Sequence, residues 1–136
     1  MKYLLDTNVC ADFLNQRYPT VVERLTRASP EDLCISSVVV AELRYGADRS
    51  ARKAQNHEKL DVFISEIQCL DFDLAAARAF GRIRTALEAD GAVIGPYDMM
   101  IAAHALSLRL VLVTDNEGEF RRVAGLKVEN WRQMDA

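Results

Sequence analysis

Residues 110–116, with the sequence LVLVTDN, carry the clearest strand signal in the chain. Four apolar residues in a row are followed directly by a threonine, an aspartate and an asparagine. A short apolar run bounded by turn-forming residues is typical of a buried strand. Residues 3–8, YLLDTN, repeat the pattern, because an apolar run ends at Asp6 and two residues that readily cap a helix come next. The two stretches predict buried strands whose carboxyl ends carry polar side chains.

Strand and helix patterns alternate through the rest of the chain. Apolar runs predict a strand at residues 33–35 and a weaker one at residues 69–72. Capping residues and apolar residues at helical spacing predict helices at residues 9–14, 19–28, 38–45, 60–67, 74–89 and 97–108. The last helix is dense in apolar residues, so we expect it near the centre of the molecule. This alternation predicts an α/β fold with a mainly parallel sheet covered on both faces.

The length and composition predict one globular domain that spans residues 1–136. A second core would need roughly 100 more residues, and half of the 136 residues are apolar while 27% are charged. Cys10, Cys34 and Cys69 are widely spaced, so we expect them to fill the core rather than to form disulfides or bind zinc. The N-terminal apolar run is too short for a signal peptide or membrane span, which predicts a soluble, cytoplasmic protein.

The charge balance alone does not suggest a nucleic-acid partner. Seventeen Lys and Arg residues against 20 Asp and Glu residues give a net charge of −3, whereas simple nucleic-acid-binding domains are basic. A local cluster that includes Arg44, Arg49 and Arg52 could override this sum. The alternative is that these arginines form a solvated helix face.

Acidic residues occur where the predicted strands and helices meet. Asp6 and Asp115 each follow a predicted strand, and Asp98 begins a helix after a Gly-Pro loop. Glu42 lies within an otherwise apolar helix. Ligands of open parallel sheets bind beyond the carboxyl ends of the strands, so these acids are expected to converge. Converging carboxylates repel one another unless a cation is present, and an all-oxygen set favours Mg²⁺ or Mn²⁺, as in metal-dependent nucleases.

Each acid also has a purely structural explanation. Asp6 could simply cap the first helix, and Asp98 could complement a helix dipole. Glu42 could face solvent or pair with a nearby arginine, and Asp115 is a common turn former.

Other chemistries find little support in the sequence. His57 and His104 lie far apart and do not form the H-E-x-x-H pattern of zinc hydrolases. No P-loop is present. A receiver or phosphatase domain that used Asp6 as a nucleophile would need a second acid beside it and a lysine after a later strand, and neither is found.

The order of the motifs resembles that of PIN domains. The matching stretches are LLDTN at residues 4–8, AELRYG at 41–46, YDMMIAAHA at 97–105 and VTDNEGEF at 113–120. The closing stretch VAGLKVENW, at 123–131, is similar to the ending of VapC-type toxins of bacterial type II toxin–antitoxin modules. The resemblance implies a PIN-like three-layer α/β/α domain. It also implies an endoribonuclease, dependent on Mg²⁺ or on Mn²⁺ in its place, that cleaves structured RNA such as tRNA and inhibits translation.

The resemblance carries over to single residues of this chain. Asp6, Glu42 and Asp98 fall on the three central acids of the family, and we expect Asp6 and Asp98 to be the direct metal ligands. Thr7 matches the small hydroxyl residue that neighbours the metal site. The alternative is a non-catalytic PIN-like module that binds RNA or protein and whose acids are structural.

The fourth acid of the family pattern stays open between two residues. Glu119 matches the acid directly before the phenylalanine. Asp115 lies one place away from the pattern, because Asn116 takes the position where many PIN domains have an aspartate.

The resemblance implies partners as well. A VapB-type antitoxin is expected to bury an apolar segment in a groove near the first four helices and to present an arginine that displaces the metal from the acids. RNA is expected to lie along Arg44, Arg49 and Arg52, and the chain is expected to form a homodimer. The expected walls of the antitoxin groove are Val9, Phe13, Val38, Val39 and Phe63.

Overall fold

The computed structural model describes residues 1–133, and within them the central sheet has five strands, all parallel. The strand order is β3-β2-β1-β4-β5. The strands are β1 (Tyr3–Leu5), β2 (Leu33–Ser36), β3 (Gln68–Leu70), β4 (Val111–Val113) and β5 (Val128–Glu129). Because β2 and β3 extend the sheet on one side of β1 while β4 and β5 extend it on the other, the strand order reverses between β1 and β4. In parallel sheets such a reversal is where ligand sites form.

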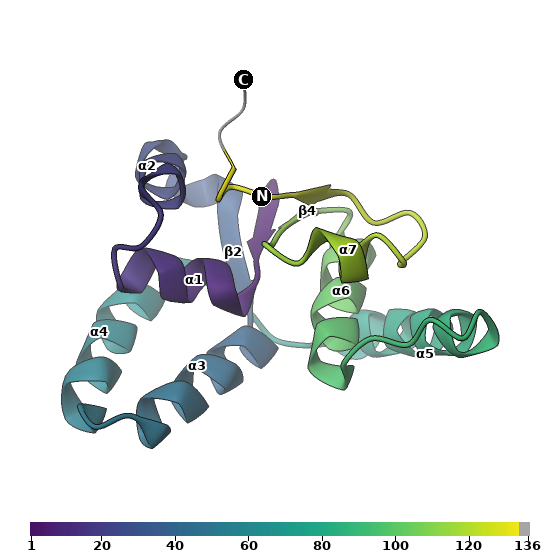
Figure 1. Cartoon of the computed structure of the whole chain (residues 1–136), viewed down its shortest axis with the longest axis horizontal. Coiled ribbons are helices and arrows are strands. Elements are labelled where there is room, and N and C mark those ends of the chain that lie inside the picture. The colour runs from purple at the N-terminus through teal and green to yellow at the C-terminus, as the bar shows by residue number, and fades with distance from the viewer. Residues whose placement is uncertain (134–136) are drawn as a thin grey trace.

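Helices cover both faces of the sheet. Figure 1 shows α1, α3 and α4 on one side of the strands and α5 and α6 on the other. This arrangement confirms the predicted three-layer α/β/α architecture. The helices are α1 (Thr7–Leu14), α2 (Pro19–Arg27), α3 (Ser37–Arg49), α4 (Lys53–Glu66), α5 (Leu74–Ala89), α6 (Pro96–Leu108) and α7 (Glu117–Phe120), with a 3₁₀ turn at Pro30–Asp32.

Local capping fixes where the helices near the sheet edge begin. The Asp6 side chain accepts a hydrogen bond from the Thr7 amide, and the Ser36 hydroxyl accepts one from the Val38 amide. These contacts start α1 directly after β1 and α3 directly after β2. A proline in the first turn, Pro96, starts α6.

The core lies around the three middle strands and α6. Leu4, Ile35 and Leu112, one from each of these strands, are fully buried. Helix α6 buries residues on all sides, including Met99 and Ile101, as its apolar composition predicts. Among residues 1–133, no helix is long and apolar enough to cross a membrane.

Three details differ from the sequence expectations. Helix α4 begins at Lys53, seven residues before the expected start, because its first two turns are largely exposed and show no apolar periodicity. Strand β5 was not expected, since two residues are too few to give a strand pattern. Cys69 is exposed rather than in the core, because it lies on the edge strand β3, whereas Cys10 and Cys34 are buried as expected.

Candidate active site

Asp6 lies at the carboxyl end of β1, at the point where the strand order reverses. Its carboxylate accepts a hydrogen bond from the Thr7 amide at 2.7 Å and one from the Thr114 hydroxyl, at the end of β4, at 2.7 Å. Only 5% of the residue is exposed. Burial raises the pKa of the Asp6 carboxyl to about 6, although both hydrogen bonds favour the charged form. Asp6 therefore does cap α1, but no Lys or Arg among residues 1–133 forms an ion pair with its buried carboxylate.

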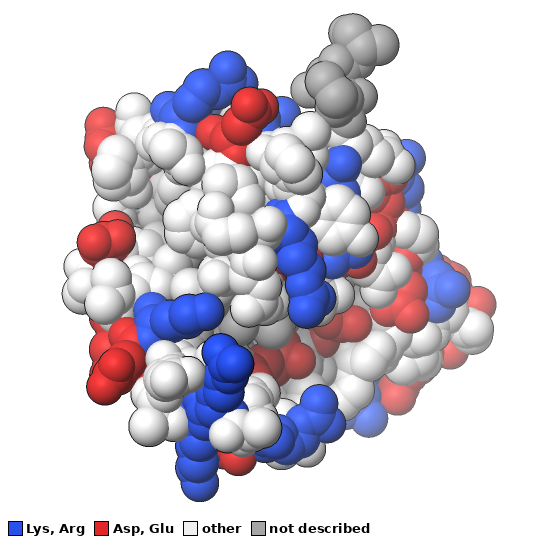
Figure 2. All heavy atoms as spheres, turned by 60° about the vertical axis from the view of Figure 1, so that its left-hand side comes forward, with Lys and Arg blue, Asp and Glu red and all other residues white. Residues whose placement is uncertain are grey.

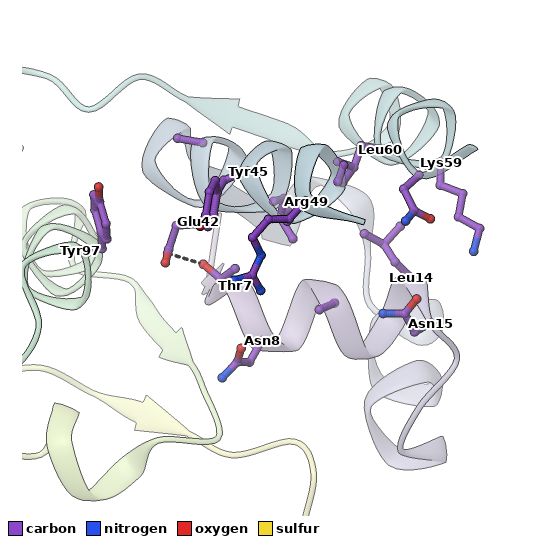
Figure 3. Close-up of a pocket in the computed structure, with 16 residues that line it drawn as sticks. Thr7, Asn8, Leu14, Asn15, Glu42, Tyr45, Arg49, Lys59, Leu60 and Tyr97 are labelled. Atoms are coloured by element: carbon purple, nitrogen blue, oxygen red, sulfur yellow. Dashed lines mark hydrogen bonds between the residues drawn. The ribbon is translucent and has the colours of Figure 1, made fainter. Parts of the chain in front are cut away.

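Glu42 reaches the same place from α3. The Thr7 hydroxyl donates a hydrogen bond to Glu42 Oε1 at 2.6 Å, and Figure 3 shows this bond across the gap between α1 and α3. Thr7 thus contacts the Asp6 carboxylate with its amide and the Glu42 carboxylate with its hydroxyl. The alternative in which Glu42 pairs with an arginine is not seen among residues 1–133.

Asp98 lies in the first turn of α6. Burial raises its pKa to about 6, and repulsion from Asp6, Glu119, Glu42 and Asp115, in decreasing order, adds to the shift. Asp98 is thus electrostatically coupled to every other acid of the candidate site. Its place near a helix N-terminus also fits the dipole explanation, but the helix end does not offset these effects.

The two candidates for the fourth acid have different surroundings. Asp115 accepts hydrogen bonds from Asn8 at 3.2 Å and from Arg132 at 3.1 Å, one on each carboxylate oxygen. Glu119, by contrast, accepts one hydrogen bond, from the Asn116 side chain at 2.8 Å. The Asp115 carboxylate therefore already has a cationic partner, whereas Glu119 is oriented by a neutral amide.

The four acids Asp6, Glu42, Asp98 and Glu119 form a cluster, called the acid cluster below, that has no ion pair with Lys or Arg in the described part of the chain. No three acidic, His or Cys side chains of residues 1–133 are drawn together tightly enough to form a ready-made metal cage. Mg²⁺ keeps several of its waters and binds through few carboxylates, so an open all-oxygen set fits it.

Comparisons with known proteins agree with this geometry. Residues 3–126 match the PIN domain family. The chain is 43% identical to the tRNA(fMet)-specific endonuclease VapC of Shigella flexneri over 131 residues and 41% identical to ribonuclease VapC2 of Rickettsia felis over 132 residues. In both cases, 96% of this chain and 98% of the relative are covered. The toxin–antitoxin complex VapBC of Salmonella typhimurium, solved bound to DNA, contains a chain that superposes with a TM-score of 0.91 at 40% identity, covering 96% of this chain and 98% of that one.

The chain belongs to the PIN-domain family of VapC ribonucleases. The resemblance inferred from the sequence motifs is therefore confirmed. In this chain β1 pairs with β4, and the hydrogen bond from the Thr114 hydroxyl to Asp6 joins the carboxyl ends of the two strands.

Sequence reasoning missed a second cluster in this VapC chain. The guanidinium of Arg132 donates two hydrogen bonds to Asp12, at 2.6 and 3.0 Å, and lies 4.3 Å above the Tyr18 ring. Asp12 is 2% exposed. These residues are 120 positions apart and belong to no motif, so only an isolated acid in an amphipathic helix could have drawn attention to Asp12.

A groove opens beside the acid cluster between α1, α3 and α4. Its volume is about 680 Å³, and its lining includes Thr7, Glu42, Leu14 and Leu60. The expected wall residues were wrong. Val9, Val38, Val39 and Phe63 are buried in the core, and neither they nor the half-buried Phe13 line the groove. The groove is lined instead by other residues of the same helices, among them the buried Leu43 and Leu60.

The three arginines expected to contact RNA differ in their surroundings. Arg44 donates a hydrogen bond to Asp61 at 2.7 Å, so its charge is already paired. Arg49 lines the groove and lies 5.2 Å from the Tyr45 ring centre. Arg52 is exposed at the start of α4. Figure 2 shows Lys and Arg side chains gathered on this face around recessed acidic atoms.

Proposed function

We propose that this VapC chain is a Mg²⁺-dependent endoribonuclease toxin that cleaves structured RNA, inhibits translation in the cytoplasm and is neutralised by a cognate antitoxin. Residues 1–136 act as one catalytic domain in this proposal. The observation that carries it is the acid cluster, four carboxylates without a cationic partner at the point where the strand order reverses. The relatives named as VapC ribonucleases supply the reaction class.

The acids would have different roles in binding Mg²⁺. Asp6 and Asp98 would bind it directly, because both are short side chains at the ends of rigid elements. Glu42 would complete the site from α3, held by the Thr7 hydroxyl. When bound, Mg²⁺ would supply the positive charge that polarises a phosphate and activates water. Mn²⁺ would serve in its place, since it takes the same hard oxygen ligands.

Glu119 is the better candidate for the fourth acid. Asp115 would have to give up hydrogen bonds to Arg132 and Asn8 before it could bind a metal. Glu119 has an amide donor on one oxygen, Oε2. Asp98 is affected more by the charge of Glu119 than by that of Asp115, whereas Asp6 is affected by that of Asp115, so the choice rests on the partners of the two acids. Asn116 would then position the Glu119 carboxylate. Asp115 would have a structural role through its hydrogen bonds from Arg132 and Asn8.

The antitoxin and the RNA substrate would both bind at the groove and the acid cluster beside it. A VapB-type antitoxin would occupy the groove between α1, α3 and α4 and present a cation to the acid cluster; the Salmonella relative was solved as a VapBC complex. RNA would lie over the acid cluster along Arg49 and Arg52, with a smaller contribution from Arg44. Self-association of the chain as a homodimer stays a prediction.

We take tRNA as the substrate class to test first, because the Shigella relative is named for cleavage of tRNA(fMet). Purified chain is incubated with total tRNA in Mg²⁺, in Mn²⁺ and in EDTA. We expect discrete fragments with either ion and none in EDTA. Asp98→Asn is expected to remove cleavage, and Glu66→Gln, which changes an exposed acid at the end of α4, is expected to keep it.

The non-catalytic alternative predicts a different outcome. A folded wild-type chain that binds RNA but releases no fragments in Mg²⁺ or Mn²⁺ would establish a binding module instead. In cells, expression of the chain alone should arrest growth, and Asp6→Asn should relieve the arrest. Harmless expression of soluble wild-type chain in a susceptible bacterium would contradict the toxin function.

A further inference from the structure

Two tyrosines beside the acid cluster expose most of their surface. Tyr45 is 62% exposed and Tyr97 is 59% exposed. Single exposed apolar residues are common on protein surfaces. These two differ because both line the groove that also contains Thr7 and Glu42. In the described part of the chain, neither tyrosine hydroxyl takes part in a hydrogen bond, so neither ring has an evident structural role.

Tyr45 belongs to one face of α3 that also carries catalytic and basic groups. Glu42, Tyr45 and Arg49 are spaced three and four residues apart, which places them on the same side of the helix. The Arg49 guanidinium lies 5.2 Å from the centre of the Tyr45 ring. This contact restrains the ring while it leaves most of the ring accessible.

Tyr97 reaches the groove from the opposite side. It directly precedes Asp98 in the first turn of α6, so its backbone is as firmly placed as that of the acid. In the view of Figure 3, the Glu42 carboxylate lies between Tyr97 and Tyr45. The two aromatic side chains therefore lie on either side of Glu42 in this view and come from two different helices.

We propose that Tyr45 and Tyr97 form a stacking site for unpaired RNA bases next to the bond that is cleaved. This inference rests on the proposed function and adds to it a site that would bind bases beside the acid cluster. Bases within a duplex are already stacked on their neighbours, whereas unpaired bases can stack on aromatic side chains. Arg49 and Lys59, both at the groove, would contact the flanking phosphates.

The test measures binding of an RNA hairpin with an unpaired loop, with a duplex of the stem sequence as the control RNA. Binding is measured on the Asp98→Asn background, so that the RNA is not cut. Tyr45→Ala and Tyr97→Ala are expected to weaken hairpin binding at least about fivefold each. Tyr45→Phe and Tyr97→Phe keep the ring and should bind within about twofold of the parent. Val62→Ala, an exposed apolar residue of α4 outside the groove, is the matched control.

A hairpin whose loop bases are removed separates stacking from other effects. The parent protein should bind this abasic hairpin more weakly, and the alanine variants should lose little further affinity, because base and ring contribute through the same contact. Melting temperatures confirm that the variants are folded.

Three results would overturn the inference. Alanine variants that bind the intact hairpin as tightly as the parent would show that the rings do not contact RNA. Equal losses of affinity for the hairpin and for the duplex would show that the tyrosine rings do not bind unpaired bases. Loss of antitoxin binding alone would assign the tyrosines to the protein partner. A wild-type chain without Mg²⁺-dependent cleavage would instead contradict the proposed function, so the two failures are distinguishable.

Discussion

Asp6 directly precedes α1, and Asp12 lies within that helix six residues later. Both residues are almost fully buried. The carboxylate of Asp12 accepts two hydrogen bonds from the guanidinium of Arg132. The carboxylate of Asp6 accepts hydrogen bonds from an amide and a hydroxyl only, and burial raises its pKa to about 6. One buried charge is thus paired within the protein, whereas the other has no cationic partner among residues 1–133.

The Asp12 contact organises a structural region rather than a catalytic one. Arg132 also contacts Tyr18 and Asp115, so it fastens the segment after β5 to α1 and to the loop after β4. Its hydrogen bonds to Asp12 raise the pKa of the Arg132 guanidinium above its usual value. The comparison suggests a rule to test: a buried acid with a partner cation has a structural role, and a buried acid without one belongs to the proposed metal site.

The largest expected effect is on cleavage. Asp98→Asn removes a proposed metal ligand and should lower the rate of RNA cleavage about 1000-fold or more, equivalent to about 4 kcal/mol of activation free energy. Because Asp98 repels the other acids, the same change should not lower the free energy of unfolding of the metal-free protein. Initial cleavage rates and urea denaturation measure the two quantities. An Asp98→Asn variant that cleaves RNA at the wild-type rate would show that Asp98 does not belong to the proposed metal site.

Asp12→Asn should give the reverse result. It leaves the Arg132 guanidinium without its carboxylate and should lower the free energy of unfolding by about 2 to 3 kcal/mol, somewhat less than for a fully buried pair because Arg132 is partly exposed. Cleavage per folded molecule should stay within about tenfold of wild type. Urea denaturation, with Asp61→Asn as a surface control, provides the measurement. An unchanged free energy of unfolding would show that Asp12 does not stabilise the fold.

The pH dependence of stability sharpens the comparison. The Asp6 and Asp98 carboxyls have pKa values of about 6 in the folded state, above the usual 3.8, so the folded state holds their protons more tightly. Their effect stabilises the metal-free protein at low pH and is lost as the pH rises through about 6. Relative to wild type, Asp98→Asn should therefore gain about 2 kcal/mol of stability between pH 4.5 and pH 7.5. Denaturation at both pH values in EDTA tests this, and a difference of the opposite sign would contradict it.

The smallest expected effect concerns the fourth acid. Asn116→Ala removes the hydrogen bond that orients Glu119 and should weaken Mn²⁺ binding about tenfold, about 1.4 kcal/mol. Asn8→Ala, which removes the amide that contacts Asp115, should change the affinity for Mn²⁺ less than about threefold. If Asn8→Ala has the larger effect, Asp115 rather than Glu119 belongs to the metal site.

The sequence was sufficient to predict four of the five strands and to single out Asp6, Glu42 and Asp98 as candidate site residues. Asp6 follows an apolar run and Asp98 opens an apolar helix, and such local patterns identify both the elements and their ends. The pairing of Arg132 with Asp12 could not be predicted, because it joins residues 120 positions apart without a repeating pattern. The groove walls could not be chosen from the sequence, because apolar periodicity alone does not separate Leu60, which lines the groove, from Phe63 one turn later, which does not. The competing roles of Asp115 and Glu119 likewise depend on contacts that only the folded chain makes.

The most direct test of the central claim is a calorimetric titration of the purified chain with Mn²⁺ and Mg²⁺ at pH 7.5. We predict that the wild-type chain and Asp12→Asn bind the ion, because the acid cluster is intact in both. Asp98→Asn and Asp6→Asn should show binding at least about tenfold weaker. A wild-type chain that binds neither ion, or binding that is equally strong in Asp98→Asn, would contradict the claim that the uncompensated acids form the metal site.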